Sequence, residues 1–239
     1  MRWKQGIARA INVPLSLVNT QIIQKPGLSI REGWRINEAD YVRHAALYML
    51  AHEIKQNEIQ GDVAELGVYQ GKTAAQVNRL FPEKRLYLFD TFEGFDERDM
   101  AVEKKNAFHD IHRSAPQFKD TSTDAVMKRM KYPDSCCIVK GFFPESLAQL
   151  AGADSIRFCF VSIDVDLYQP MLAGLCYFYE KLQGGGYILV HDYHNAEFSG
   201  VHAAVQKFIE ESNATYVPIP DAFGSVVIMK PYDIERLAT

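Results

Sequence analysis

Strand-length apolar runs alternate with segments of helical pattern from Gly61 onward, and this alternation restricts the fold more than any other feature. The predicted strands cover residues 62–66, 85–89, 136–139, 157–163 and 187–190, and the predicted helices cover 73–80, 122–130, 144–150, 170–182 and 200–212. Short, mostly apolar strands are typical of a parallel sheet whose two faces are both covered by helices. The sequence therefore predicts a doubly wound α/β fold.

The C-terminal part departs from this alternation. Two β-rich runs, 215–217 and 225–229, follow Asn213, with prolines and a glycine between them and no helical segment. Strands that follow one another without a helix are typical of antiparallel pairing. We therefore expect a mostly parallel sheet with an antiparallel C-terminal edge.

The N-terminal part has a different character. Residues 40–57 place apolar side chains at helical spacing, which predicts an amphipathic helix ahead of the first strand. The apolar positions are Val42, Ala45, Ala46, Met49 and Leu50. Residues 1–40 have no clear period, and the segment through Arg31 carries five basic residues and no acidic one. We predict an arm or lid over residues 1–40 and a globular domain over 41–239.

The composition is that of a soluble globular protein, since 47% of the 239 residues are hydrophobic and 23% are charged. The net charge of −4 gives no electrostatic reason to expect a nucleic acid partner. Asn12, Pro14 and Ser16 interrupt the longest apolar stretch near the start, so we expect a cytoplasmic protein without stable membrane insertion. A homo-oligomer is left open.

The cysteines give no sign of a metal site or of catalysis. They lack the paired CxxC spacing of zinc sites, and they occur in apolar segments: Cys136, Cys137, Cys159 and Cys176. We expect reduced residues of the core.

Residues 65–73 read E-L-G-V-Y-Q-G-K-T and look at first sight like a phosphate-binding loop. A P-loop needs four residues between its first glycine and its Gly-Lys pair, because successive backbone N–H groups must curl around a phosphate. Gly67 and Gly71 have three residues between them. This spacing indicates a ligand other than a nucleotide phosphate.

The glycine turn after the first strand and the acid at the end of the second form a candidate cofactor site. Ligands of open α/β sheets bind beyond the carboxyl ends of the strands, where Asp90 could accept both hydroxyls of a ribose. An NAD site would need G-x-G-x-x-G, but Tyr69 stands at the middle position. S-adenosylmethionine has no pyrophosphate, and Glu65 could accommodate its cationic end. Turn chemistry is the alternative for Gly67 and Gly71, and helix capping for Asp90.

Acids and histidines follow the fourth and fifth predicted strands. Strand-end positions could bring Asp164 and Asp192 to one rim, where carboxylate oxygens suit Mg²⁺. A metal-bound alcohol is more acidic, and a nearby carboxylate can take its proton before the oxygen attacks a methyl group. His191 is a further candidate ligand and His194 a candidate base, although structural roles are common for such histidines. Asp166 is better placed to cap the next helix.

Five motifs follow one another along the chain: A-E-L-G-V-Y-Q-G-K-T, L-F-D-T-F-E-G-F, K-G-F-F-P-E-S-L, S-I-D-V-D-L-Y and G-G-G-Y-I-L-V-H-D-Y. Together they resemble the macrocin and mycinamicin type of O-methyltransferases, a family that includes enzymes acting on deoxysugars of antibiotics. The resemblance runs over residues 62–208. It implies a class I methyltransferase fold of the Rossmann-like type, S-adenosylmethionine as methyl donor, and a magnesium-dependent transfer to a sugar hydroxyl.

The resemblance also implies roles for single residues. Asp164 would be a metal ligand and the base, and Asp192 a second ligand. The family commonly has two adjacent acids before the tyrosine, whereas this chain has His191 before Asp192. An imidazole there would favour Mn²⁺, iron or zinc. We expect cofactor contacts from Glu65, Gly67, Tyr69, Gly71, Thr73, Asp90, Thr91, Phe92, Ser122, Gly141, Phe142 and Asp164.

The leading hypothesis is a metal-assisted O-methyltransferase that uses S-adenosylmethionine and acts on a small-molecule acceptor, with a sugar hydroxyl as the expected target. Two alternatives remain. A nicotinamide-dependent oxidoreductase would share the glycine turn and the acid after the second strand, but the third glycine is missing. A non-catalytic module that keeps the cofactor pocket is the other alternative, because His191 departs from the family pattern.

Overall fold

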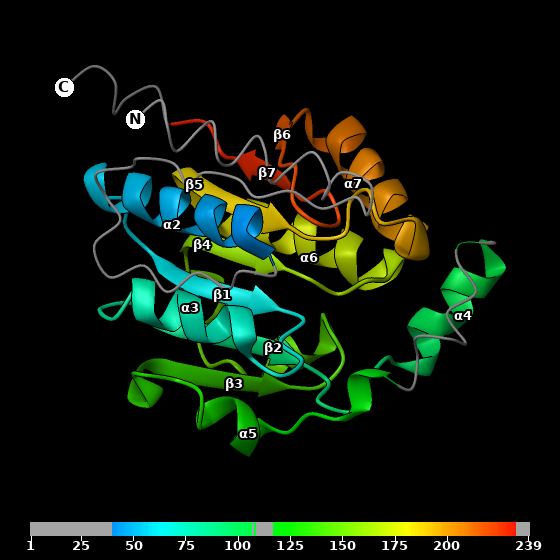
Figure 1. Cartoon of the computed structure of the whole chain (residues 1–239), viewed down its shortest axis with the longest axis horizontal. Helices are drawn as coiled ribbons and strands as arrows, with labels where there is room; N and C mark the ends of the chain where they lie inside the picture. The colour runs from blue at the N-terminus through cyan, green and yellow to red at the C-terminus, as the bar shows by residue number, and fades with distance from the viewer. Residues whose placement is uncertain (1–39, 107, 109–116, 233–239) are drawn as a thin grey trace, which may run out of the picture. The chain divides into compact units, whose positions relative to one another are not determined.

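Seven strands form one sheet in the order β3-β2-β1-β4-β5-β7-β6 (Figure 1). The structure is a computed structural model that describes residues 40–106, 108 and 117–232. The strands are β1 (Asp62–Leu66), β2 (Leu86–Asp90), β3 (Cys136–Lys140), β4 (Phe158–Ile163), β5 (Leu182–Val190), β6 (Tyr216–Pro218) and β7 (Val226–Met229). Neighbours among β1 to β5 pair in parallel, while β7 is antiparallel to β5 and β6. The predicted doubly wound sheet with an antiparallel edge is confirmed.

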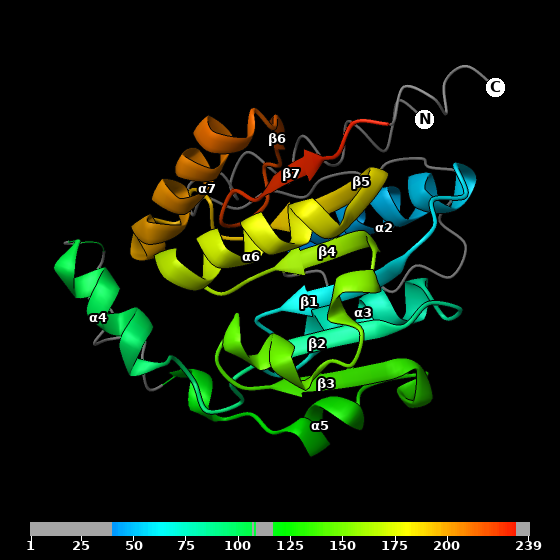
Figure 2. The same ribbon diagram turned by 180° about the vertical axis from the view of Figure 1, so that it is seen from behind.

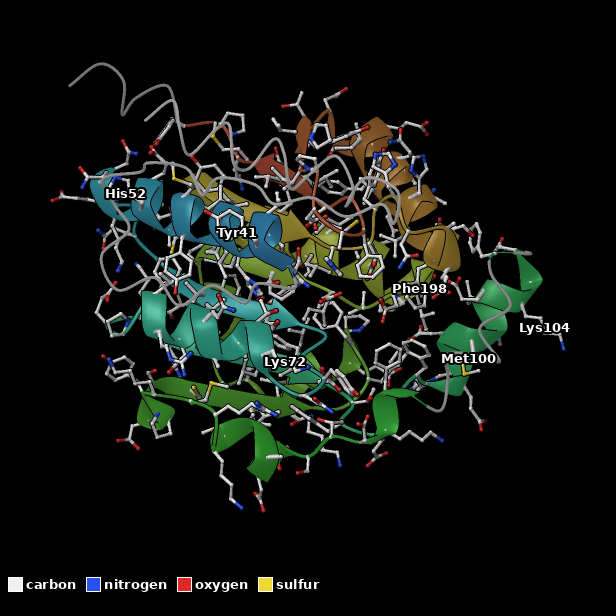
Figure 3. All side chains as sticks on the ribbon, in the orientation of Figure 1. Tyr41, His52, Lys72, Met100, Lys104 and Phe198 are labelled. Atoms are coloured by element: carbon white, nitrogen blue, oxygen red, sulfur yellow. The ribbon has the colours of Figure 1, made fainter. Side chains whose placement is uncertain are left out.

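Helices cover both faces of the sheet (Figure 2). The α-helices are α2 (Tyr41–Gln56), α3 (Lys72–Leu80), α4 (Glu97–Lys105), α5 (Thr123–Met127), α6 (Tyr168–Lys181) and α7 (Ser199–Ser212), and the 3₁₀ helices are η4 (Gln117–Lys119), η5 (Pro133–Ser135), η6 (Glu145–Gln149), η7 (Ala153–Ser155) and η8 (Ala196–Phe198). Figure 3 shows Tyr41 and Lys72 on the first turns of α2 and α3, which lie on the same face.

Two cores meet at the sheet, because successive residues of a strand point to opposite faces. Val63 of β1 and Leu88 of β2 belong to the core formed with α2 and α3. Ala64 and Phe89, the next residues along the same strands, belong to the core formed with α6 and α7. The near-continuous apolar runs of the sequence thus serve both cores at once.

The buried face of α2 is not the predicted one. The predicted apolar positions are all partly exposed, and the helix instead buries Arg43, His44, Leu47, Tyr48, Ala51 and Ile54. The apolar pattern misleads because Arg43 and His44 are buried without being apolar. Both line the cavity at the carboxyl edge of the sheet.

Other predicted boundaries also differ from the structure. β5 begins at Leu182 rather than at residue 187. Its first half was not predicted because it contains three glycines, 184–186, which are uncommon in strands. Gly186 has no room for a side chain, since a Cβ would lie 2.9 Å from the carbonyl oxygen of Cys159. The helix expected over 122–130 ends at Met127, and that expected over 144–150 is the 3₁₀ helix η6. Helix α4 was not predicted, because its mostly charged sequence lacks an apolar stripe.

The remaining expectations concern the N-terminus, the membrane and the cysteines. Apart from Asp40, the predicted arm or lid over 1–40 lies outside the described residues, all of which belong to one compact unit. No described helix combines the length and apolar character needed to cross a bilayer. Cys159 is buried as predicted, but Cys176 is exposed on α6.

Candidate functional site

A cavity of about 440 Å³ opens at the carboxyl ends of the parallel strands, which is where ligands bind in open α/β sheets. Residues that follow β1, β2, β4 and β5 line it, together with Asp40, Arg43 and His44 of the α2 region. Most of the predicted site residues are brought together there: Glu65, Gly67, Tyr69, Thr73, Asp90, Thr91, Gly141, Asp164, His191 and Asp192.

Asp90 organises the turn that follows β1. Its Oδ2 accepts the backbone N–H groups of Val68 at 2.7 Å and Tyr69 at 2.8 Å, and its Oδ1 accepts that of Phe92 at 2.6 Å. Residues 65–73 and Asp90 form what we call the cofactor turn. The predicted contact of Asp90 with a ribose stays a prediction, and any such contact would use the remaining lone pairs of a carboxylate already fixed by the backbone.

Gly67 lets the cofactor turn approach the end of β4. Its φ of +84° is in the region that favours glycine, and a Cβ at this position would lie 2.1 Å from the carbonyl oxygen of Asp164. The strand ends are held side by side by the bond from the Asp164 N–H to the Leu66 carbonyl at 2.9 Å. This glycine is therefore required by close approach as well as by backbone conformation.

Glu65 places a buried carboxyl group at the bottom of the cofactor turn. It is 1% exposed, and its Oε2 has no hydrogen-bond partner among the described residues. Burial, with the nearby Asp164 adding to it, raises the pKa of Glu65 well above its usual range, although Arg43 opposes the rise. A cation bound beside Glu65 would stabilise its ionised form, which agrees with the predicted role toward a cationic cofactor.

Four predicted cofactor residues do not line the cavity: Gly71, Phe92, Ser122 and Phe142. Gly71 is the left-handed N-cap of α3. Ser122 is exposed and caps α5, its Oγ accepting the Ala125 N–H at 3.2 Å. The ring of Phe142 lies 3.6 Å below the guanidinium of Arg98. These residues shape the surroundings of the cavity rather than its wall.

A network of charged groups joins the ends of β4 and β5 to helix α2. Asp164 Oδ2 accepts a hydrogen bond from Arg43 Nη2 at 2.8 Å, and Asp164 Oδ1 lies 2.9 Å from His191 Nδ1. The same nitrogen lies 2.8 Å from Asp192 Oδ2, while Asp192 Oδ1 accepts the amide of Asn195 at 2.8 Å. We call Asp164, His191 and Asp192 the acid rim. Each of its four carboxylate oxygens thus has a protein partner.

The charged groups of this network shift one another's pKa values. Burial by itself would raise the pKa of Asp164, but Arg43 and His191 outweigh it and hold the pKa well below its usual range. Burial would lower the pKa of His191, but the carboxylates of Asp164 and Asp192 raise it to about 10. The acid rim is therefore an ion-pair network with Asp164 ionised and His191 protonated at neutral pH.

Asp166 does not cap α6 as predicted. The N-cap of this helix is Leu167, without a side-chain bond, and Glu103 of α4 instead accepts the N–H of Tyr168 at 2.6 Å. Asp166 is buried with a φ of +63° and is hydrogen-bonded to Asp192. Burial, with Asp164 and Asp192 adding to it, raises its pKa well above the usual range. The closely spaced acids of D-V-D are the one signal of this environment in the sequence.

His194 lies apart from the acid rim. It is exposed, it is not part of the cavity wall, and its ring contacts that of Tyr193 at a centroid distance of 4.6 Å. Its position does not favour the predicted role as a base. Arg43, which sequence reasoning missed, contacts Asp164 directly; its only signal is a charged residue within an expected amphipathic helix.

The predicted metal ligands fit a metal by type and distance. Ligand atoms of Asp164, His191 and Asp192 lie within 4.8 Å of one another, and the same holds for Asp40, His191 and Asp221. Carboxylate oxygens and imidazole nitrogens suit Mn²⁺, Fe²⁺ or Zn²⁺, and the oxygens alone suit Mg²⁺. At the acid rim, a metal would have to share oxygens with Arg43 and Asn195 or displace them.

A family model described as macrocin-O-methyltransferase (TylF) matches residues 41–221. The chain belongs to this family. It is therefore an O-methyltransferase, as the five motifs implied, and the alternative of a nicotinamide-dependent oxidoreductase is not supported. The matched segment contains the whole cofactor turn and the acid rim.

Solved methyltransferase structures share the fold of this family member at low sequence identity. The O-methyltransferase NovP superposes with a TM-score of 0.64 at 20% identity over 77% of each chain. The calicheamicin methyltransferase CalS11 gives 0.58 at 18% identity over 77% of each chain. TomG from Streptomyces achromogenes, solved in complex with SAM, gives 0.53 at 12% identity over 93% of this chain and 96% of that one. No curated protein sequence matches the chain.

These likenesses confirm the class I methyltransferase fold. Family membership and the SAM complex of TomG support S-adenosylmethionine as the methyl donor of this macrocin-O-methyltransferase family member. In such a fold the glycine turn after β1 and the acid after β2 lie where an adenosine cofactor binds.

Proposed function

We propose that the enzyme transfers a methyl group from S-adenosylmethionine to a hydroxyl of a sugar, carried by a natural product or a glycoconjugate, in the cytoplasm. One observation carries the proposal: the cofactor turn and the acid rim line the same cavity, with Gly67 directly against the backbone of Asp164. A donor held at the turn and a hydroxyl held at the rim would therefore be neighbours.

The cofactor turn supplies the donor side. Bound there, S-adenosylmethionine would supply a methyl group on a positively charged sulfur. Glu65 offers a buried carboxyl group, which the cationic end of the cofactor would stabilise in its ionised form, and the turn fixed by Asp90 offers backbone groups to the adenosine side. Both features favour a cationic ligand without phosphate, in agreement with the spacing of Gly67 and Gly71.

The acid rim supplies the acceptor side. We assign Asp164 as the group that takes the proton of the acceptor hydroxyl. A carboxylate whose pKa is held low is always ionised at neutral pH but accepts protons weakly, so the hydroxyl must itself be made more acidic. Arg43 and His191 place positive charge beside Asp164, and this charge would stabilise a developing alkoxide that comes to lie next to it.

A divalent metal ion is part of the proposal. Mg²⁺ or Mn²⁺ held by Asp164 and Asp192, with His191 as a third candidate ligand, would lower the pKa of a bound hydroxyl. The support is the convergence of these ligand atoms within 4.8 Å. Removal of metal by EDTA should then reduce turnover, and Mn²⁺ or Mg²⁺ should restore it.

A sugar acceptor is supported by the names of similar structures. CalS11 is described as a TDP-rhamnose 3'-O-methyltransferase, and its apo form superposes on this chain with a TM-score of 0.51. The cavity volume of about 440 Å³ falls in the range of sites for small molecules. The proposed acceptor is therefore a small molecule rather than a macromolecule.

The experiment that tests the function is titration calorimetry with S-adenosylhomocysteine, followed by incubation with S-adenosylmethionine and TDP-rhamnose or other nucleotide-linked deoxysugars. We expect binding of the cofactor product, and a mass gain of one methyl group in one of the sugars. A folded protein that binds no S-adenosylhomocysteine would contradict the proposal. Binding without transfer to any acceptor, with or without metal, would favour the non-catalytic module.

A further inference from the structure

His191 lies between two different pairs of carboxylates. Nδ1 lies 2.9 Å from Asp164 Oδ1 and 2.8 Å from Asp192 Oδ2. The side chain is about nine-tenths buried, yet Nε2 has no hydrogen-bond partner among the described residues. A ring nitrogen of His191 also lies within 4.8 Å of carboxylate oxygens of Asp40 and Asp221. Because Nδ1 is committed to the first pair, Nε2 is the nitrogen left for the second.

The first pair of carboxylates fixes the state of the ring. Ionised carboxylates only accept hydrogen bonds, so Nδ1 must carry the proton that it shares between Asp164 and Asp192. In the neutral ring, the lone pair is then on Nε2. A histidine that binds a metal through one nitrogen usually donates its other N–H to a carboxylate, which sets the tautomer and the ring orientation. His191 already makes this contact with carboxylates through Nδ1.

The second pair of carboxylates is held in place by the protein. Asp221 Oδ1 accepts the N–H of Ser225 at 2.8 Å, and Oδ2 accepts the Ser225 hydroxyl. Ser225 is fully buried, so Asp221 cannot turn away without loss of both bonds. Asp40 occupies the N-cap position of α2 but makes no capping bond, so the helix itself does not occupy its carboxylate. The ring edge of Phe223 contacts His191 at a centroid distance of 5.6 Å and restricts its rotation.

We propose that Asp40, Nε2 of His191 and Asp221 form a site for a divalent transition metal ion such as Mn²⁺ or Zn²⁺, distinct from the acid rim, so that His191 binds this ion rather than one held by Asp164 and Asp192. One imidazole nitrogen with two carboxylate oxygens is a donor set that suits these ions. Three protein ligands leave at least one coordination position open. Asp40 and His191 line the cavity, so an ion held by them would lie beside the space in which a ligand would bind.

The test is a count of bound Mn²⁺ from the electron paramagnetic resonance signal of the free ion, with full-length protein and no other ligand. The titration is run at pH 8.5, where Mn²⁺ displaces the proton on Nε2 more easily than at neutral pH. We expect Asp221→Asn and Asp40→Asn each to weaken binding of one ion by about 100-fold or more. Loss of a group that only supports a ligand weakens metal binding by about 10–100-fold, and loss of a ligand itself should cost at least the upper end of this range. Asp134→Asn, an exposed aspartate in η5, is the matched control and should bind as the native protein does.

Two results would overturn the site. One is native binding of Mn²⁺ in both the Asp221→Asn and Asp40→Asn proteins, with loss only in Asp192→Asn, which would place the ion on the acid rim alone. The other is the absence of bound Mn²⁺ in the native protein at millimolar concentration. Asp40→Asn is informative even if Asp221→Asn unfolds, because the Asp40 side chain makes no capping bond to α2 that the substitution would remove.

Metal binding by Asp40, His191 and Asp221 does not depend on methyl transfer. Binding of S-adenosylhomocysteine, measured on the same samples, separates the two outcomes. If the native protein binds S-adenosylhomocysteine but no Mn²⁺, the metal site and the metal assistance proposed above both fail, while the proposed methyl transfer from S-adenosylmethionine stands. If it binds Mn²⁺ in the expected way but no S-adenosylhomocysteine, the proposed function fails while the metal site stands.

Discussion

The cofactor turn and the acid rim line the same cavity but are built in different ways. The cofactor turn is held by backbone groups. The N–H groups of Val68, Tyr69 and Phe92 all donate to the single carboxylate of Asp90. The acid rim is held by side-chain charges that come from distant parts of the chain, since Arg43 and Asp164 are separated by 121 positions. A backbone turn needs a spacing of glycines, whereas a charge network needs a tertiary fold.

The two regions should therefore fail in different ways when they are changed. Substitutions in the cofactor turn act on conformation, so they should reduce stability and cofactor affinity together. Substitutions in the acid rim act on charge, so they should change the chemistry and its pH dependence while the turn remains intact. Gly67 and Asp164 are the points at which the two regions touch, and the largest effects are expected there.

Gly67→Ala is expected to have the largest effect on stability, a loss of more than about 4 kcal/mol, since the new methyl group would lie 2.1 Å from the Asp164 carbonyl oxygen at a positive φ. Urea unfolding measures the loss. Gly152→Ala is the matched control, with a φ of +71° but the nearest atom 3.4 Å away, and should cost about 1–2 kcal/mol. Equal losses in the two variants would show that close approach to β4 does not matter.

Asp164→Asn should abolish most of the chemistry and leave the cofactor turn intact. Loss of a positioned proton acceptor lowers turnover by about 10²–10⁴-fold, while the turn held by Asp90 is untouched. The measurements are methyl transfer under single-turnover conditions and calorimetry with S-adenosylhomocysteine. The exposed Asp124→Asn serves as control. Weaker cofactor binding with unchanged turnover would reverse the assignment of the two regions.

The difference between the two regions also decides what could be predicted from the sequence. Glu65, Gly67 and Asp90 occur in short motifs at the ends of strands, so a correct strand assignment places them at the cavity. Asp164 and Asp192 likewise follow the ends of predicted strands. In all these cases, a position at the end of a parallel strand predicts a place beside the cavity, because the carboxyl ends of the strands share one edge of the sheet.

The partners of the acid rim could not be predicted in this way. Arg43 comes from α2, Asp40 from the position before this helix and Asp221 from the loop between β6 and β7. Nothing in the spacing of residues says which strand end they lie near. Arg43 even contradicts the apolar pattern of its helix. Ser122 was expected at the cofactor from a motif, and its contact there stays a prediction; in the structure its side chain caps α5.

Asp90→Asn tests how far the cofactor turn depends on one carboxylate. The amide offers a single acceptor oxygen to three backbone N–H groups, so we expect a loss of about 2–3 kcal/mol in unfolding free energy and weaker binding of S-adenosylhomocysteine. Asp120→Asn is the control, because the exposed Asp120 also contacts Tyr69, through its hydroxyl, and should change stability by no more than about 0.5 kcal/mol. A stable Asp90→Asn protein with native affinity would leave the turn without the support that we assign to Asp90.

The last and smallest effect is a pH dependence that belongs to the acid rim alone. The carboxylates of Asp164 and Asp192 raise the pKa of His191 to about 10 in the folded protein, above the value of about 6.5 expected in the unfolded chain. The stability that this charge contributes is therefore fully present below about pH 6.5 and is lost as the pH rises toward 10, with a slope of about 1 kcal/mol per pH unit.

Urea unfolding at a series of pH values from 6 to 9.5, in EDTA, measures this slope. In His191→Gln the slope between pH 7 and 9 should become shallower, because the side chain that takes up the proton is gone. Tyrosines and cysteines that titrate in the same range are shared by both proteins, so the difference between the two curves isolates His191. Parallel curves for the native and variant proteins would mean that His191 is not charged within the acid rim, and the contrast between a rim built from charges and a turn built from backbone bonds would no longer hold.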